Sequence, residues 1–445
     1  MVGQEQNTAS IFDINLRPAA TAFLLMAMFV ATVANPPLAQ AQTYKVLHTF
    51  TGGADGSGPG GGGITSDSTG NLYGVTVSGG VYSPNCLTDG EQNGCGTAYR
   101  MTRKAGAWTF NVLYSFDAEG DGYAPDEILA IASDGSLYGS TFYGPNNVCS
   151  GNGCGTVFRL QPPAAFCSAV SCPWSETVLH RFQGYPNDGS QPAFGHLTFD
   201  TAGNLYGTTS WGGPGSVAGS VYELTRNGNS WTEYVLHNFT GGYDGDASWS
   251  GVVFDPAGNL YGTTTYGGAN SEGVIFQMVR SGSGWSENVL HSFNLSTDGG
   301  GALGSVVLDA AGNLYGTTRG FGPHNGGTVW ELSPANGSWN FSVIYAFSGS
   351  PDNGPDSGLL MDRVGNLYGA TSYEGAHGWG NVFKLSPGNG GWTYTSLYDF
   401  SGGSDGGAPD GQLTMDSQGN LFGATFLGGS GQGYQGNGVV FEITP

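Results

Sequence analysis

The residues best suited to chemistry are carboxylates that recur in the loops of this chain. Asp117, Glu119 and Asp121 alternate within the segment Asp117-Ala-Glu-Gly-Asp-Gly122, the order of oxygen ligands with which an EF-hand loop begins. They are candidate ligands for Ca²⁺. Position 12 of that loop is Ile128 instead of a bidentate Glu, so an ordinary tight turn of Asp and Gly is the alternative interpretation.

A second candidate set is aromatic and lies in or beside the same loops. Aromatic faces next to carboxylates and amides are what sugar rings need for stacking and hydrogen bonding. The set therefore predicts a ligand-binding surface, and packing between structural units is the alternative. Its members are Tyr143, Trp211, Tyr266 and Tyr373, which share one position of a repeat, together with Trp249 and Trp379.

The sequence contains no motif of nucleophilic or phosphate chemistry. There is no Gly-x-Ser-x-Gly nucleophile elbow, because the match Gly402-Gly-Ser-Asp-Gly406 belongs to an Asp-Gly link of the repeat. His-Glu-x-x-His and P-loop patterns are missing, whereas paired carboxylates of a glycoside hydrolase stay open as an alternative. One repeated position holds a His in four units and a Tyr in three, which indicates a half-buried packing position instead of a ligand. These residues are His48, His180, His237 and His291, and Tyr114, Tyr345 and Tyr398.

The charge balance restricts the partners. The chain has 34 acidic and 12 basic residues, so its surface should repel nucleic acid and anionic membranes and attract cations.

The elements that must position these residues come from a repeat. The string Gly-Asn-Leu-Tyr-Gly, or a near copy, begins at seven positions, and the later copies are 53 to 55 residues apart. Such a period indicates one supersecondary unit repeated in series. The copies begin at Gly70, Gly135, Gly203, Gly258, Gly312, Gly365 and Gly419.

Each unit reads as four short strands. In the fourth unit we expect strands at 251–255, 259–264, 273–278 and 285–293, all rich in β-branched and aromatic residues and bounded by Gly, Asn and Asp. Four-stranded antiparallel units in series are typical of a β-propeller, here with seven blades.

The two ends of the chain predict how the ring closes. After the last third strand the chain stops at Pro445, so the seventh unit lacks its fourth strand. The segment Val46-Leu-His-Thr-Phe50 matches the fourth strand at Val235-Leu-His-Asn-Phe239. The N-terminal strand should therefore complete the last blade and remove an exposed sheet edge.

The N-terminus and the cysteines predict export. Arg17 precedes an apolar run from Ala19 to Ala34, and Ala39-Gln40-Ala41 offers a cleavage site, so residues 1–41 are expected to be a signal peptide and 42–445 the propeller. A single membrane anchor is the alternative, although the run is short for a span. Near-neighbour cysteines predict three local disulfides in an oxidising compartment: Cys86–Cys95, Cys149–Cys154 and Cys167–Cys172.

The complete unit closely resembles the GloVer tandem repeat of bacterial surface and secreted proteins. The resemblance rests on Asp-x-x-Gly-Asn-Leu-Tyr-Gly-Thr-Thr, Gly-x-Val-Phe-x-Leu, Trp with Leu-Tyr-x-Phe, and Gly-Gly-x-Asp-Gly, and it spans about Tyr44 to Pro445. The family is associated with C-terminal sorting anchors and has no established biochemical role. This chain ends on a strand instead, so free secretion to the periplasm or the extracellular space is expected.

The expected protein is a secreted, monomeric, all-β propeller that binds a polysaccharide or a cell-surface protein on its loop-rich face, with Ca²⁺ as a candidate cofactor and no nucleic-acid partner. Two alternatives stay open. One is a calcium-dependent polysaccharide lyase, hydrolase or lactonase, and the other is a structural component of the envelope.

Overall fold

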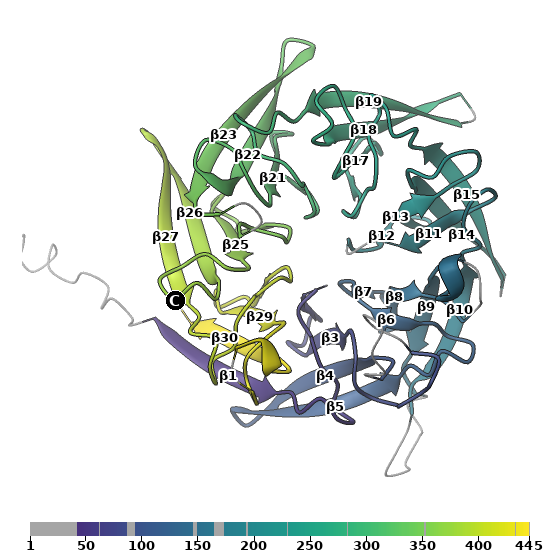
Figure 1. The fold of residues 1–445 in the computed structure, drawn as a ribbon, viewed down its shortest axis with the longest axis vertical. Coiled ribbons are helices and arrows are strands. Elements are labelled where there is room, and N and C mark those ends of the chain that lie inside the picture. The colour runs from purple at the N-terminus through teal and green to yellow at the C-terminus, as the bar shows by residue number, and fades with distance from the viewer. Residues whose placement is uncertain are drawn as a thin grey trace, which may run out of the picture. The chain divides into compact units, whose positions relative to one another are not determined.

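The computed structural model describes residues 42–61, 63–86, 94–145, 149–163, 173–192, 195–228, 230–282, 284–350, 353–431 and 433–444. Thr43–Thr444 form one compact unit. Seven antiparallel sheets follow one another around a centre (Figure 1). The chain is therefore a seven-bladed β-propeller, as the repeat predicts.

The two inner strands of each blade are joined by the tight turn before Gly-Asn-Leu-Tyr-Gly. The innermost strands are two residues long: β2 (Thr65–Ser66), β7 (Ala130–Ile131), β12 (Thr198–Phe199), β16 (Val253–Phe254), β20 (Val307–Leu308), β24 (Leu360–Met361) and β28 (Thr414–Met415). The second strands are β3 (Leu72–Thr76), β8 (Leu137–Tyr143), β13 (Leu205–Gly212), β17 (Leu260–Thr263), β21 (Leu314–Thr318), β25 (Leu367–Thr371) and β29 (Leu421–Thr425).

The two outer strands are longer. The third strands are β4 (Thr97–Lys104), β9 (Thr156–Gln161), β14 (Ser220–Asn227), β18 (Val274–Ser281), β22 (Asn325–Ala335), β26 (Asn381–Gly388) and β30 (Val439–Thr444). The fourth are β5 (Ala107–Ser115), β10 (Ser175–Arg181), β15 (Ser230–Asn238), β19 (Gly284–Ser292), β23 (Ser338–Ser348), β27 (Gly391–Asp399) and β1 (Thr43–Thr49). Blades 2 and 3 add β6 (Tyr123–Pro125) and β11 (Gly189–Pro192), and two 3₁₀ turns are η1 (Cys149–Gly151) and η2 (Gly433–Gln435).

The N-terminal strand closes the ring. β1 pairs antiparallel with β30, with Thr43 opposite Thr444 and Thr49 opposite Val439. In Figure 1 the purple β1 lies beside the yellow β30. The predicted completion of the last blade is confirmed.

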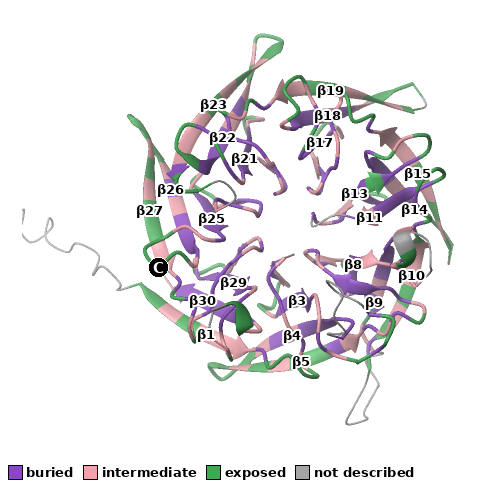
Figure 2. Ribbon diagram, in the orientation of Figure 1, coloured by how far each residue is buried: buried purple, intermediate pink, exposed green. Residues whose placement is uncertain are grey.

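The hydrophobic core lies between blades. One buried cluster joins Ile275 and Phe293 of blade 4 to Leu314 and Trp330 of blade 5, and similar clusters occupy the other contacts between neighbouring blades. Gly316 lies directly under Trp330, because a Cβ atom there would come within 2.3 Å of the indole ring. Burial is greatest on the second strands, the innermost strands are of intermediate burial, and exposed residues gather on the outermost strands (Figure 2).

The repeated pentapeptide is a turn-forming element. In blade 4 the Asp255 carboxylate accepts hydrogen bonds from the backbone N–H groups of Ala257 and Asn259, both at 2.9 Å, and from the Asn259 amide at 2.8 Å. Tyr261 donates its hydroxyl to the same carboxylate at 3.1 Å. The Tyr–Asp bond recurs as Tyr73–Asp67, Tyr206–Asp200, Tyr315–Asp309 and Tyr368–Asp362. These Tyr residues therefore have a structural role.

Replacing Asp255 by Ala should test this element. The change leaves several donors of one turn without their acceptor, so we expect a loss of about 1–3 kcal/mol in the free energy of unfolding, measured by urea denaturation. Lys45→Ala, at an exposed position of β1, is the control and should change stability by less than about 0.5 kcal/mol. Equal effects of the two variants would contradict the assigned role.

Two of the three predicted disulfides are present. Cys86 is bonded to Cys95 and Cys149 to Cys154, and each bond lies within a loop between a second and a third strand. Cys167 and Cys172 lie outside the described residues, as do residues 1–41. Within the described part of the chain, no helix reaches the length and hydrophobicity of a membrane span.

Candidate functional site

Two sets of loops meet on one face of the propeller. The loops that connect successive blades form β-bridges with the loops between second and third strands, at Asp246–Tyr266, Gly300–Gly320 and Gly407–Leu427. We call this side the loop face. It is the side on which the sequence predicts aromatic and acidic residues to gather.

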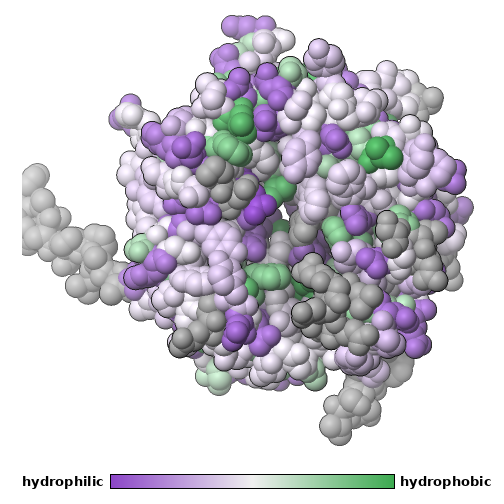
Figure 3. All heavy atoms as spheres, viewed as in Figure 1, coloured by the Kyte–Doolittle hydropathy of each residue, from purple (hydrophilic) through white to green (hydrophobic). Residues whose placement is uncertain are grey.

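A pocket opens on the loop face where six blades converge at the centre of the ring. We call it the channel-mouth pocket, and its volume is about 460 Å³. Six lining residues share one place in the repeat, nine residues before the first Gly of the pentapeptide: Gly61, Asp126, Trp249, Leu303, Asp356 and Asp410. Thr265, Arg319 and Phe426 lie seven residues after that Gly, and Tyr266 is the next residue after Thr265. Figure 3 shows hydrophilic and hydrophobic residues together around the centre of the ring.

Asp356 is held by a cation and a hydroxyl. Its Oδ1 lies 3.1 Å from Nε of Arg319, and Ser372 donates its hydroxyl to Oδ2 at 2.6 Å. Asp356 is therefore oriented by partners from blades 5 and 6, and its charge is balanced within the pocket.

Among the residues that the structure describes, neither Asp126 nor Asp410 forms an ion pair like that of Asp356. Burial, together with the negative charge of Asp356, raises the pKa of Asp410 to about 7. Burial likewise raises the pKa of Asp126 well above its ordinary value, with a contribution from the charge of Asp410. Each has one buried carboxyl oxygen without a hydrogen-bond partner in the described structure. Asp126 approaches so closely that a Cβ atom on Gly61 would collide with its Oδ1.

The aromatic residues form another part of the pocket wall. Trp249 is half-buried and its indole lies 6.1 Å from the Phe142 ring, centroid to centroid. Tyr266 is 52% exposed. Phe426 packs over Gly58 and Gly60, where added Cβ atoms would come within 2.9 Å. The pocket thus combines aromatic faces with carboxyl groups and one guanidinium.

The six aromatic residues of the predicted ligand-binding set do not all lie together in the structure. Trp249 and Tyr266 line the channel-mouth pocket. The charge of Asp410 adds to burial in raising the pKa of Tyr373, which places this Tyr near the pocket. Tyr143 instead stacks on Tyr123, with ring centroids 4.9 Å apart. The remaining two are Trp211, 41% exposed on β13, and Trp379, 5.1 Å from Tyr434.

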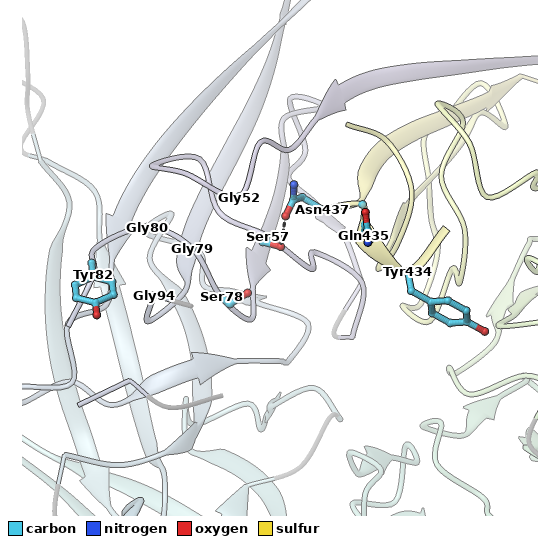
Figure 4. Close-up of a pocket in the computed structure, with 11 residues that line it drawn as sticks. Gly52, Ser57, Ser78, Gly79, Gly80, Tyr82, Gly94, Tyr434, Gln435 and Asn437 are labelled. Carbon is cyan, nitrogen blue, oxygen red and sulfur yellow. Dashed lines mark hydrogen bonds between the residues drawn. The ribbon is translucent and has the colours of Figure 1, made fainter. Parts of the chain in front are cut away.

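A second concavity lies on the loop face between blades 7 and 1. This rim groove has a volume of about 470 Å³, and the described residues that line it are uncharged. Tyr82, 65% exposed, and Tyr434, 74% exposed, lie on opposite sides of it, with Ser57, Ser78 and Asn437 between them (Figure 4). Ser57 donates a hydrogen bond to the Asn437 side chain at 2.9 Å. Neither Tyr belongs to the predicted set.

Two of the predicted Ca²⁺ ligands, Asp117 and Asp121, accept hydrogen bonds from neighbouring residues of the chain. Asp121 accepts hydrogen bonds from the Tyr114 hydroxyl at 2.8 Å and from the backbone N–H of Ala118 at 3.0 Å. Asp117 accepts one from the N–H of Glu119 at 2.8 Å. Ca²⁺ binding by Asp117, Glu119 and Asp121 stays a prediction.

A bond like that between Tyr114 and Asp121 recurs around the ring. It explains why one position of the repeat holds either a His or a Tyr. Besides Tyr114, five of these residues bond to the Asp of the following loop: His48–Asp55 at 3.2 Å, His180–Asp188 at 3.1 Å, His237–Asp244 at 3.3 Å, His291–Asp298 at 2.9 Å and Tyr398–Asp405 at 3.1 Å. Asp352, which follows Tyr345, lies outside the described residues. The position is half-buried, as predicted, whereas its hydrogen-bond partner, the Asp of the loop, was not predicted.

A β-bulge places these side chains. In blade 3, His237 is opposite Val221 while Val235 is opposite Tyr222, so Leu236 is the extra residue. All seven fourth strands show the same shift in register. Because one extra residue reverses the alternation of side chains, the position two residues after the Trp faces one neighbouring blade and the His or Tyr faces the other.

Comparisons with known proteins identify the repeat. A family model described as the Gloeobacter/Verrucomicrobia repeat matches residues 150–363. No curated protein matches the chain.

Three solved structures resemble the fold at low identity. One is a protein proposed to be a gluconolactonase (12% identity, TM-score 0.41, covering 81% of this chain and 95% of that chain). Another is an oxidoreductase, proposed to be a glucose dehydrogenase, from Thermus thermophilus (16%, 0.41, 71% and 95%). The third is a protein of unknown function from Dyadobacter fermentans (12%, 0.44, 91% and 98%). At these scores they indicate no activity for this chain. The repeats and the family match together make the chain a GloVer-type repeat protein.

Proposed function

We propose that the protein binds carbohydrate on its loop face, with the channel-mouth pocket as the primary site. The observation that carries the proposal is the meeting of Trp249, Tyr266 and Phe426 with Asp126, Asp356 and Asp410 in one pocket of about 460 Å³. A pocket of that size accepts one or two sugar rings, and ligand sites commonly combine apolar walls with a few polar groups.

The chemistry of the lining selects the kind of sugar. Aromatic faces stack on the C–H faces of a sugar ring, whereas carboxyl groups accept hydrogen bonds from its hydroxyls. Among the described lining residues the guanidinium of Arg319 is already paired with Asp356, which disfavours an anionic ligand. A neutral polysaccharide is therefore a better fit than a polyuronate. The rim groove, whose described lining residues are uncharged and include exposed Tyr82 and Tyr434, offers a further surface for a long chain.

Export is part of the proposal. Residues 1–41 read as a signal peptide, and the disulfides Cys86–Cys95 and Cys149–Cys154 are of a kind that forms in oxidising compartments. We propose that the mature protein is a monomer that meets polysaccharides or surface proteins outside the cytoplasm.

Trp249→Ala should weaken carbohydrate binding at least ten-fold, because it removes a stacking surface from the pocket. The measurement is affinity electrophoresis in gels with laminarin, xyloglucan, galactomannan or dextran, followed by calorimetry on any polysaccharide that retards the protein. Tyr243→Ala is the matched control, since Tyr243 is 80% exposed in an interblade loop and does not line the pocket. Absence of retardation by all four polysaccharides, or equal loss in both variants, would refute the proposed site.

A second candidate function, glycoside hydrolysis, is favoured by the contrast between two carboxyl groups. Asp356 is paired with Arg319, while the pKa of Asp410 is raised to about 7 by burial. Neighbouring carboxyl groups in contrasting environments are the arrangement of an acid and a base in glycosidases. Release of reducing ends from a bound polysaccharide, abolished by Asp410→Asn with binding retained, would support this function. Binding without release supports the non-catalytic function.

A further inference from the structure

The outer rim of the propeller repeats one interblade contact, and its composition changes around the ring. The His or Tyr of a fourth strand faces the residue that lies four positions before the His or Tyr of the next blade. That residue is two positions after the Trp, or after Gln42 in blade 7. In four contacts that residue is aromatic and the rings stack: His48–Phe110, His291–Phe341, Tyr345–Tyr394 and Tyr398–Tyr44. In blades 2, 3 and 4 it is Glu176, Glu233 and Glu287.

One of these Glu residues joins a His and an Asp in a compact group. His180 Nε2 lies 3.1 Å from an Asp188 oxygen and 3.6 Å from Glu233 Oε2. Among the described residues, these three side chains form the set of His, Cys, Asp or Glu groups whose ligand atoms all lie within 4.8 Å of one another. The equivalent set of His237, Asp244 and Glu287 does not reach that proximity.

The distances match those between ligands of one metal ion. Zn²⁺ bonds to His nitrogen and carboxylate oxygen of about 2.0–2.1 Å, arranged as a tetrahedron, place neighbouring ligand atoms about 3.3–3.4 Å apart. The two observed separations, 3.1 and 3.6 Å, lie on either side of that value.

A second observation concerns Glu233 itself. Its Oε1 is buried and has no hydrogen-bond partner in the described structure. The three side chains keep 8 to 21% of their surface exposed, which leaves access from solvent.

We propose that His180, Asp188 and Glu233 bind a divalent transition-metal ion, with Zn²⁺ the best fit, between the outer strands of blades 2 and 3. The imidazole Nε2 and one oxygen of each carboxylate supply three ligands, and solvent supplies the fourth. Asp188 already accepts backbone hydrogen bonds from Gln183 and Gly189, but each carboxylate oxygen has a second lone pair for the ion. This site is separate from the channel-mouth pocket and does not depend on carbohydrate binding.

The test is a titration of tag-free, chelator-treated protein with ZnCl₂ by calorimetry, and with CoCl₂ by visible absorption. We expect one Zn²⁺ per chain, a rise in melting temperature with the ion, and the d–d bands of tetrahedral Co²⁺. Glu233→Gln should weaken Zn²⁺ binding at least ten-fold, and Glu287→Gln, the matched control on the next blade, should leave it unchanged.

Glu233→Phe distinguishes the loss of a metal ligand from a general loss of folding. Phe341 and Phe110 occupy the same position in other blades, so Phe should be accepted at 233 while binding is lost. A wild-type protein that takes up no Zn²⁺ overturns the proposal, and so does equal binding by the Glu233 and Glu287 variants.

Discussion

Deleting residues 43–50 is expected to open the ring and abolish its cooperative thermal transition near the wild-type temperature. The deletion removes all the backbone pairing between β1 and β30. It also removes fully buried Phe50, and loss of a buried Phe side chain alone costs about 3–5 kcal/mol. The stacked contacts of Tyr44 with Tyr398 and of His48 with Phe110 disappear as well. Calorimetry should show a melting temperature more than about 10 °C lower.

The exposed edge of β30 should also make the truncated protein associate, which size-exclusion chromatography would detect. Lys45→Ala is the control, because Lys45 is exposed on the same strand and its loss should change stability by less than about 0.5 kcal/mol. A synthetic peptide of residues 43–50 should restore part of the lost stability. A truncated protein that melts within a few degrees of the wild type and stays monomeric would show that closure by β1 is dispensable.

The free energy of unfolding is expected to fall as the pH rises from about 6.5 to 8. Several carboxyl groups have pKa values raised by burial: Glu176 to about 8, and Glu233, Glu287, Glu374 and Asp410 to about 7. The folded state therefore binds more protons than the unfolded state between the ordinary and the raised pKa, so stability decreases with pH in that window. Each unit of pKa difference corresponds to about 1.4 kcal/mol per fully buried group.

Other ionisable groups change the stability at lower pH or in the opposite direction. Burial lowers the pKa of His48, His196 and His237, which adds stability as the pH rises toward 6.5. Hydrogen bonds in the turns outweigh burial and lower the pKa of Asp67, Asp255 and related residues, so that contribution is lost only in acid. Urea denaturation at half-unit intervals from pH 5 to 8 measures the profile. Glu287→Gln should flatten its upper part, and a profile that rises throughout would contradict the prediction.

The fold could be predicted because the repeat carries it in every unit. Gly-Asn-Leu-Tyr-Gly marks a turn and a strand, and the match between residues 46–50 and the fourth strands reveals the closing strand. In blade 4 the expected strands at 259–264 and 285–293 correspond to Leu260–Thr263 and Gly284–Ser292. Local patterns were sufficient because each blade repeats the same hydrogen-bonded turn and the same interblade packing.

The channel-mouth pocket could be predicted only in part. Four of the six aromatic candidates lie eight residues after the first Gly of the pentapeptide, whereas Thr265, Arg319 and Phe426 line the pocket from seven residues after it. Neighbouring residues of a strand point to opposite sides, and the sequence does not show which side faces the channel. The sequence did contain an indication of the pocket nine residues before that Gly. The residues around this position repeat from unit to unit, whereas the position itself changes from Gly61 to Asp126 to Trp249.

The rim contacts could not be predicted because they depend on the bulge. Simple alternation places the residues two and six positions after the Trp on one side of the strand. The extra residue, Leu236 in blade 3, separates them onto two sides. That reversal brings Glu233 toward His180 of the preceding blade, and these two residues are 53 positions apart in sequence.

The register of β1 and β30 also bears on how the gene could be rearranged. Thr43 lies opposite Thr444, so a short linker could join the two ends of this strand pair, and new termini could be opened in an exposed hairpin loop of another blade. In such a circular permutant β1 would follow β30 in one continuous hairpin, and the noncovalent seam would move to the blade that was cut. The seam is thus set by where the chain is interrupted, and any blade of this ring could carry it.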